Sequence, residues 1–162
     1  MKKLLIANRG EIAIRIARTA AEMGIATVAI YSEDDANSLH TRKTDEARAL
    51  KGKGPAPYLD IDQIVAIARE AGADAVHPGY GFLAENAEFA RACAKAGITF
   101  VGPTPEALEL FGDKHRAREL AQVVKVPVMP GTHGGITLAE ARKFLESTGA
   151  IMLKAVAGGG GR

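Results

Sequence analysis

The sequence has 162 residues, of which 47% are hydrophobic and 25% are charged, an ordinary balance for a globular protein. Its 21 basic and 19 acidic side chains leave a net charge of +2, which gives no reason to expect nucleic acid or an anionic membrane as a partner. Cys93 is the single cysteine and cannot form a disulfide framework. The apolar run near the N-terminus is too short for a signal peptide, and none approaches a transmembrane length. We therefore expect a cytoplasmic location.

Strand-like and helix-like segments alternate along the first hundred residues. Short apolar runs predict strands, and apolar residues spaced at i, i+3, i+4 and i+7 predict helices between them. A strand, a helix and a strand within about 30 residues indicate a parallel sheet. The predicted strands are Lys3–Ala7, Ile25–Tyr31, Glu46–Leu50, Ala73–His77 and Ile98–Val101. The sequence thus predicts an α/β fold with a doubly wound, five-stranded parallel sheet.

The pattern changes after Gly102-Pro103. Thr104-Pro105-Glu106 has the cap and proline typical of a helix start, and Asp113 caps the next helix. We expect Ala117, Leu120, Ala121 and Val124 to form one stripe on that helix. After Pro130 the sequence predicts a short strand, a turn at Gly134-Gly135, a helix over Leu138–Glu146 and a strand over Ile151–Val156. The expected division is a first domain over 1–112, a linker helix over 113–126, and an incomplete second unit over 127–162.

Ligands of open parallel sheets bind at the carboxyl ends of the strands. Three loops should converge there: Asn8–Glu11, Ser32–Asp35 and His77–Asn86. In the last of these, two glycines and a proline force a tight backbone, around which lie His77, Tyr80 and Glu85. A turn that merely caps a helix remains the alternative interpretation.

The final stretch carries a second candidate site. Lys154 is a charge set between apolar residues of the predicted strand, which is costly without a partner. Four glycines follow, and their bare N–H groups can curl around a phosphate while Lys154 and Arg162 supply positive charge. A flexible linker is the alternative. Lys114 lies in the first turn of its helix, where the macrodipole favours an anion, although a solvated lysine remains possible. The four glycines are Gly158, Gly159, Gly160 and Gly161.

Six motifs occur in an order that resembles one family. They are Ala7-Asn-Arg-Gly-Glu-Ile-Ala-Ile-Arg-Ile16, Tyr31-Ser-Glu-Asp-Asp35, His77-Pro-Gly-Tyr-Gly-Phe-Leu-Ala-Glu-Asn86, Phe100-Val-Gly-Pro103, Gly112-Asp-Lys114 and Lys154-Ala-Val-Ala-Gly-Gly-Gly-Gly-Arg162. Together they resemble the N-terminal part of biotin carboxylase, the ATP-grasp component of biotin-dependent carboxylases. The resemblance covers the chain from Lys3 to Arg162, and it implies a Rossmann-like domain followed by the start of an ATP-grasp lid.

The resemblance implies an enzyme that uses MgATP and bicarbonate to carboxylate biotin on a carrier domain through carboxyphosphate. By the same match, Lys114 and Lys154 would contact ATP phosphates, and Gly158–Gly161 with Arg162 would form the lid. Tyr80 and Glu85 would border the pocket for bicarbonate and biotin. The Mg²⁺ ligands would lie outside this chain, so the 162 residues alone are expected to be inactive. A separate carboxyltransferase would select the acceptor, for which acetyl-CoA, propionyl-CoA, pyruvate and urea all remain open.

Some features depart from the family or leave another function open. The segment 51–60 lacks the family's usual Ser-Tyr-Leu-Asn, and Lys125 stands where glycine is common. The helix face with Arg15, Arg18 and Glu22 corresponds to a surface that some relatives use to form dimers; a solvated face is the alternative. A non-catalytic assembly module therefore remains a second hypothesis. A nicotinamide-binding domain is disfavoured, because Asn8-Arg9-Gly10 supplies one glycine instead of three.

Overall fold

The first part of the chain folds around a five-stranded parallel sheet. The structure is a computed structural model that describes residues 1–132 and 135–153. The strand order is β3-β2-β1-β4-β5, and every neighbouring pair is parallel, as the sequence predicted. The strands are β1 (Lys3–Ile6), β2 (Ala26–Tyr31), β3 (Glu46–Ala49), β4 (Ala75–His77) and β5 (Thr99–Phe100). β1 is the central strand, so the loop that follows it lies in the middle of the sheet's carboxyl edge.

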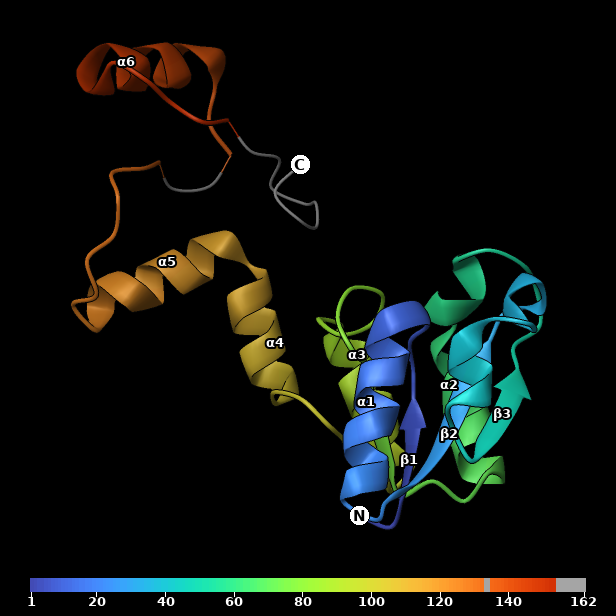
Figure 1. Cartoon of the computed structure of the whole chain (residues 1–162). Coiled ribbons are helices and arrows are strands. Elements are labelled where there is room, and N and C mark those ends of the chain that lie inside the picture. Colours follow the sequence, from blue (N-terminus) through green and yellow to red (C-terminus); the bar gives the residue numbers. More distant parts are fainter. Residues whose placement is uncertain (133–134, 154–162) are drawn as a thin grey trace. The chain divides into compact units, whose positions relative to one another are not determined.

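Helices cover both faces of this sheet (Figure 1). On β1, Leu4 and Ile6 join one buried cluster while Leu5 joins the other, because successive side chains of a strand point to opposite faces. The first cluster packs against α1 (Gly10–Glu22), whose alanines and Ile16 form its buried stripe. The second packs against α2 (Ile61–Glu70) and α3 (Ala87–Lys95). The alternation of apolar residues in β1 therefore accounts for the two layers of helices.

Three short 3-10 helices lie where the sequence predicted only loops. They are η1 (Glu33–Asp35), η2 (Leu39–Arg42) and η3 (Ala56–Leu59). The richness of residues 51–57 in Lys, Gly and Pro predicts an exposed loop, and this prediction is wrong at its end, because Pro57 is buried and the adjoining Tyr58 is fully buried. The phenol ring reaches the core while its hydroxyl hydrogen-bonds at the sheet edge. An aromatic residue in a polar segment was the signal that the prediction overlooked.

The chain divides into two compact units, Met1–Glu109 and Leu110–Arg162. α4 (Pro105–Gly112) crosses this division, and the second unit contains α5 (Lys114–Val123) and α6 (Leu138–Thr148). Local signals define α6: Thr137 and Glu140 form a capping box, and Gly149 ends the helix with φ +74°. The predicted domain boundaries stay predictions.

One expectation about the second unit was wrong within the described residues. Gly131–Thr132 and Ile151–Leu153 have no strand structure, whereas the rest of the predicted final strand, from Lys154, lies outside the described residues. The five strands that the structure describes all belong to the first unit, so no described strand pairs with these segments. The expected stripe of α5 is partly covered, because Ala117, Leu120 and Ala121 are half-buried, whereas Val124, which follows the helix, is exposed. Of the helices that the structure describes, none is long and apolar enough to cross a membrane.

Candidate active site

Three loops meet at the carboxyl edge of the sheet, as the strand pattern predicted. They follow β1, β2 and β4, which are neighbours in the sheet. Asn8, after β1, hydrogen-bonds the loop after β4, and Arg9 forms an ion pair with Asp35 in the loop after β2. The loops are therefore joined by direct bonds and form one polar surface.

Asn8 is the central polar group of this surface and is only 3% exposed. Its Nδ2 donates to the carbonyl oxygens of Pro78 and Tyr80, each at 2.8 Å, and its Oδ1 accepts from the Arg9 N–H at 2.8 Å. The reverse amide orientation would place Oδ1 against two carbonyl oxygens, so the chemistry permits only one. A buried amide with all these bonds fixes the path of the loop after β4.

Arg9 and Asp35 form a second, partly buried connection. The guanidinium donates to Asp35 Oδ2 at 3.0 Å, and the same carboxylate accepts from the hydroxyls of Tyr58 and Ser38. Burial alone would raise the pKa of Asp35, but the hydrogen bonds from Arg9, Tyr58 and Ser38 outweigh it and hold that pKa below its ordinary value. The hydrogen bond to Asp35 raises the pKa of Arg9, and burial raises the pKa of Tyr58 to about 12. The pair is therefore charged at neutral pH.

The loop after β4 has a strained backbone. Gly79 and Gly81 have φ of +68° and +65°, and Phe82, which is not a glycine, has φ of +39°. The ring of Phe82 stacks on that of Tyr58 with centroids 5.2 Å apart, and the Arg9 guanidinium lies 5.9 Å from its centroid. These contacts offset the cost of a left-handed backbone at a bulky residue. The loop is held in one shape by groups from two other loops.

This loop presents Tyr80 and Glu85 to solvent. Tyr80 is 61% exposed, and its hydroxyl donates to Glu11 Oε1 at 2.8 Å, which raises the pKa of the phenol. Glu85 is exposed four residues after Gly81, just before Asn86 caps α3. The structure thus places both predicted residues on one ordered loop, and it pairs Tyr80 with Glu11, which the sequence did not predict. Their predicted roles toward bicarbonate and biotin stay predictions.

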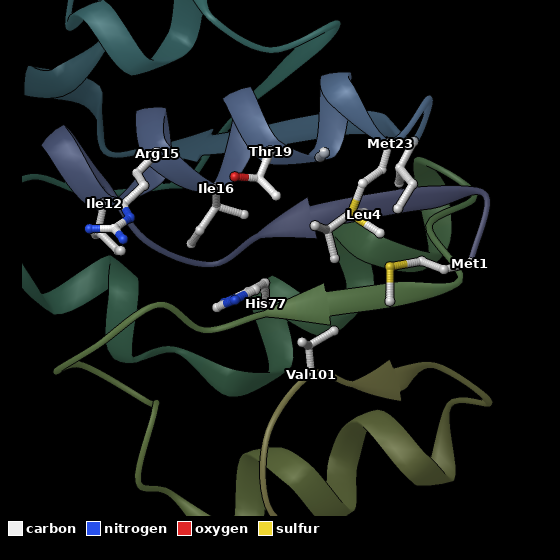
Figure 2. Close-up of a pocket in the computed structure, with 11 residues that line it drawn as sticks. Met1, Leu4, Ile12, Arg15, Ile16, Thr19, Met23, His77 and Val101 are labelled. Carbon is white, nitrogen blue, oxygen red and sulfur yellow. The ribbon is translucent and has the colours of Figure 1, made fainter.

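His77 connects the loop to an apolar cavity of about 370 Å³ between α1 and the sheet (Figure 2). Its Nδ1 accepts from the Gly79 N–H at 3.0 Å, so the neutral ring carries its proton on Nε2. Burial lowers the pKa of His77, which favours this neutral form. Figure 2 shows the ring on the same side of the sheet as Ile16 and Val101, which line the cavity with it. The cavity offers apolar contacts and little charge, unlike the loop surface.

The predicted phosphate-binding residues belong to the second unit. Lys114 is the first residue of α5 and is exposed, directly after Asp113, whose carboxylate accepts from the His115 and Arg116 N–H groups. The remaining predicted residues are Lys154, Gly158, Gly159, Gly160, Gly161 and Arg162, which lie outside the described residues. In residues 1–132 and 135–153, no cluster of His, Cys, Asp and Glu side chains could hold a metal ion.

The proposed dimer face lies on α1. Arg15, Arg18 and Glu22 are all exposed, and no salt bridge in the described part of the chain links Arg18 to Glu22. Arg15 and Arg18 line a shallow depression with Glu11, Ile14 and Thr19. The face is accessible and polar, which suits either solvent or a second protein surface.

Comparison with known proteins identifies the family. The family model described as "Biotin carboxylase, N-terminal domain" matches residues 1–108. A putative urea carboxylase of Emericella nidulans is 55% identical over 163 residues, which is 99% of this chain and 13% of that protein. A biotin carboxylase of Halalkalibacterium halodurans is 54% identical over 167 residues, which is 99% of this chain and 36% of that protein. The chain thus spans a minor part of the length of these relatives.

Solved structures agree with this match. The biotin carboxylase domain of a single-chain bacterial carboxylase has a TM-score of 0.88 and 57% identity over 92% of this chain and 35% of that one. The biotin carboxylase domain dimer of Hydrogenobacter thermophilus 2-oxoglutarate carboxylase, in complex with MgADP, ADP and bicarbonate, has a TM-score of 0.89 and 47% identity over 98% of this chain and 36% of that one. Sequence and fold agree, and the chain belongs to the family of biotin carboxylase N-terminal domains.

Proposed function

We propose that this chain is the N-terminal part of a biotin carboxylase that carboxylates carrier-bound biotin with ATP and bicarbonate. The observation that supports this most is the family match over residues 1–108, which includes all three loops of the carboxyl edge. The Hydrogenobacter domain, which was solved in complex with MgADP and bicarbonate, supports the same substrates. In the multi-domain relatives, a carrier domain and a carboxyltransferase would use the carboxylated biotin.

The proposed reaction has two steps. A bicarbonate oxygen attacks the γ-phosphorus of ATP, and the bond to the departing ADP oxygen breaks, which gives carboxyphosphate. The carboxyl carbon then passes to a biotin ureido nitrogen, its bond to the phosphate oxygen breaks, and the N–H proton leaves to a base. Most of the catalysis in the first step is positioning and charge neutralisation. Mg²⁺, when bound, would help to neutralise the charge of the phosphates, and no described residue of this chain is assigned to hold it.

The proposed site residues of this chain form two groups, one for bicarbonate and biotin and one for ATP. Tyr80 and Glu85 border the position of bicarbonate and biotin at the sheet edge. Lys114 and Lys154 neutralise the phosphates, and the glycines before Arg162 close over the nucleotide and exclude water. Lys154 has the larger effect, because it precedes a lid that lowers the local dielectric, whereas exposed Lys114 is screened by salt. The face of Arg15, Arg18 and Glu22 would serve a dimer, as the Hydrogenobacter domain is described as one.

A chimera tests the proposal. This chain replaces the matched segment of the Halalkalibacterium halodurans biotin carboxylase, and bicarbonate-dependent ADP release is measured with free biotin or a biotinylated carrier as acceptor. We expect activity in the chimera and none in the 162-residue chain. Lys154→Met should raise the ATP KM and lower kcat together, whereas Lys114→Met should mainly raise KM, more at low salt than at high salt. A folded but inactive chimera, or ordinary ATP kinetics in Lys154→Met, contradicts the proposed function.

A further inference from the structure

The loop that carries Tyr80 does not hold its shape through its own hydrogen bonds alone. Three of its residues have positive φ: Gly79, Gly81 and Phe82. Such conformations persist when the surrounding structure determines them, and they concentrate at functional sites. The main-chain carbonyls of Pro78 and Tyr80 both accept from one side chain outside the loop, that of Asn8.

The fit between Asn8 and the loop is close. A Cβ atom at Gly79 would lie 2.6 Å from Asn8 Nδ2 and 3.0 Å from its Cγ, so only glycine admits the amide at this position. Asn8 itself is anchored, because its Oδ1 accepts from the Arg9 N–H directly after β1. The Asn8 amide therefore fixes the backbone on both sides of Gly79 relative to the central strand β1.

Tyr80 is then fixed at two points. Its carbonyl is held by Asn8, and its hydroxyl by Glu11 in the first turn of α1. Without the first bond, Glu11 would hold the ring by a single exposed contact while the backbone beneath it shifted. Displacements of about 1 Å at a reacting group can lower rates by about 100-fold.

We propose that Asn8 is a positioning residue, which holds the Pro78–Tyr80 backbone so that Tyr80 and the segment leading to Glu85 meet bicarbonate and biotin in a fixed geometry. This rests on the proposed function. Asn8 itself touches no substrate. Changes at Asn8 should affect the kinetics with biotin and bicarbonate more than those with ATP. The reason is that the residues proposed to bind phosphate, Lys114 and Lys154, belong to the other unit.

Asn8→Asp is the sharpest variant, because it keeps the shape and the acceptor for the Arg9 N–H while it removes both donors to the loop. In the chimera we expect kcat/KM for biotin to fall about 10- to 100-fold, with the ATP KM changed less than about 2-fold. Two facing carbonyls and burial should raise the pKa of the new carboxyl above about 3.9. Its protonated form can donate one hydrogen bond, so the loss relative to wild type should shrink as pH falls from about 8 to about 6. Asn8→Ala should show the same loss without this pH dependence.

Thr27→Val is the matched control. Thr27 is also 3% exposed, and it hydrogen-bonds Asp45 at the amino end of β2, away from the loop. We expect this variant to lower stability but leave the biotin kinetics unchanged. A loss of biotin kcat/KM in Thr27→Val that matches the loss in Asn8→Asp, or an equal rise of the ATP and biotin KM values in Asn8→Asp, would overturn the positioning role.

Hydrogen exchange of the 162-residue chain tests the inference without any activity. Peptides that cover residues 77–86 should exchange faster in Asn8→Asp than in wild type, and not in Thr27→Val. If Asn8→Asp does not fold, Gly79→Ala displaces the same contact from the loop side and should give the same kinetic and exchange pattern. An inactive wild-type chimera contradicts the proposed function alone, whereas unchanged exchange over residues 77–86 contradicts the role of Asn8.

Discussion

The two units of the chain bury their apolar side chains very differently. In Met1–Glu109, both faces of the sheet are covered and most large apolar residues are buried. In the described part of the second unit, Ala141 is the one buried hydrophobic residue, whereas Val123 and Met129 are 77% and 82% exposed. Yet α6 has a complete capping box and a glycine stop. Local signals therefore suffice to specify a helix, but stability requires surfaces that pack together.

The largest expected difference between the two units is in the stability lost when a phenylalanine is replaced by alanine. Phe89 is fully buried and meets Phe100 edge to face, with centroids 5.8 Å apart, whereas Phe111 is 64% exposed. Phe89→Ala should lower the free energy of unfolding by about 3–5 kcal/mol, because it leaves a cavity in the core. Phe111→Ala should change it by less than about 0.5 kcal/mol. The measurement is urea unfolding followed by far-UV circular dichroism, to which helices of both units contribute, and by tyrosine fluorescence, which reports the first unit because all three tyrosines lie there. Similar losses in both variants would erase the contrast between the units.

Removal of the ion pair between Arg9 and Asp35 should lower stability less than Phe89→Ala does, and the loss should depend on pH. Asp35→Asn should lower the stability of the first unit by about 1–3 kcal/mol at pH 7, because hydrogen bonds to a charged acceptor are lost. The folded pKa of Asp35 is depressed, so its contribution is complete above the unfolded pKa of about 3.9 and disappears as pH falls through the lower folded pKa. The difference between wild type and Asp35→Asn should therefore stay constant from about pH 7 to 5 and shrink below about pH 4. Urea unfolding across this range checks it, and a constant difference down to pH 2 would contradict the assignment.

The smallest effect concerns the second unit alone. Thr137→Ala removes the cap of α6 and should raise the hydrogen exchange rates of its first turns by an amount equivalent to about 0.5–2 kcal/mol. The unfolding midpoint reported by tyrosine fluorescence should not move. Thr148→Ala is the control at the other end of the helix, where the hydroxyl bonds only the carbonyls of Phe144 and Ala150. A shift of the tyrosine midpoint in Thr137→Ala would show that α6 stabilises the first unit.

Sequence patterns predicted the elements of the first unit because each strand and helix carries its own periodicity. Convergence of three loops followed from the parallel sheet alone. The hydrogen-bond partners within the site could not be predicted in this way, because they join distant segments. Asn8 bonds the carbonyl of Tyr80, 72 residues away, and Asp35 bonds the hydroxyl of Tyr58, 23 residues away. The burial of Pro57 and Tyr58 was missed, because the polar residues around them give no sign that the Tyr58 ring stacks on Phe82. The spacing of the α5 stripe gave its helix correctly, but spacing alone could not tell that its residues would be only half-buried.

The central position of β1 bears on how the protein is made. β1 pairs with β2, which follows soon after it, and with β4, whose Ala75 lies opposite Leu4. At about 5–20 residues per second on the ribosome, roughly 70 intervening residues take about 4–14 s to synthesise. During that interval one edge of this largely apolar strand has no partner, which is the condition under which chaperones bind nascent chains and unpaired edges aggregate. Synonymous codons that slow translation between β2 and β4 would lengthen that exposure without altering a single contact of the finished fold.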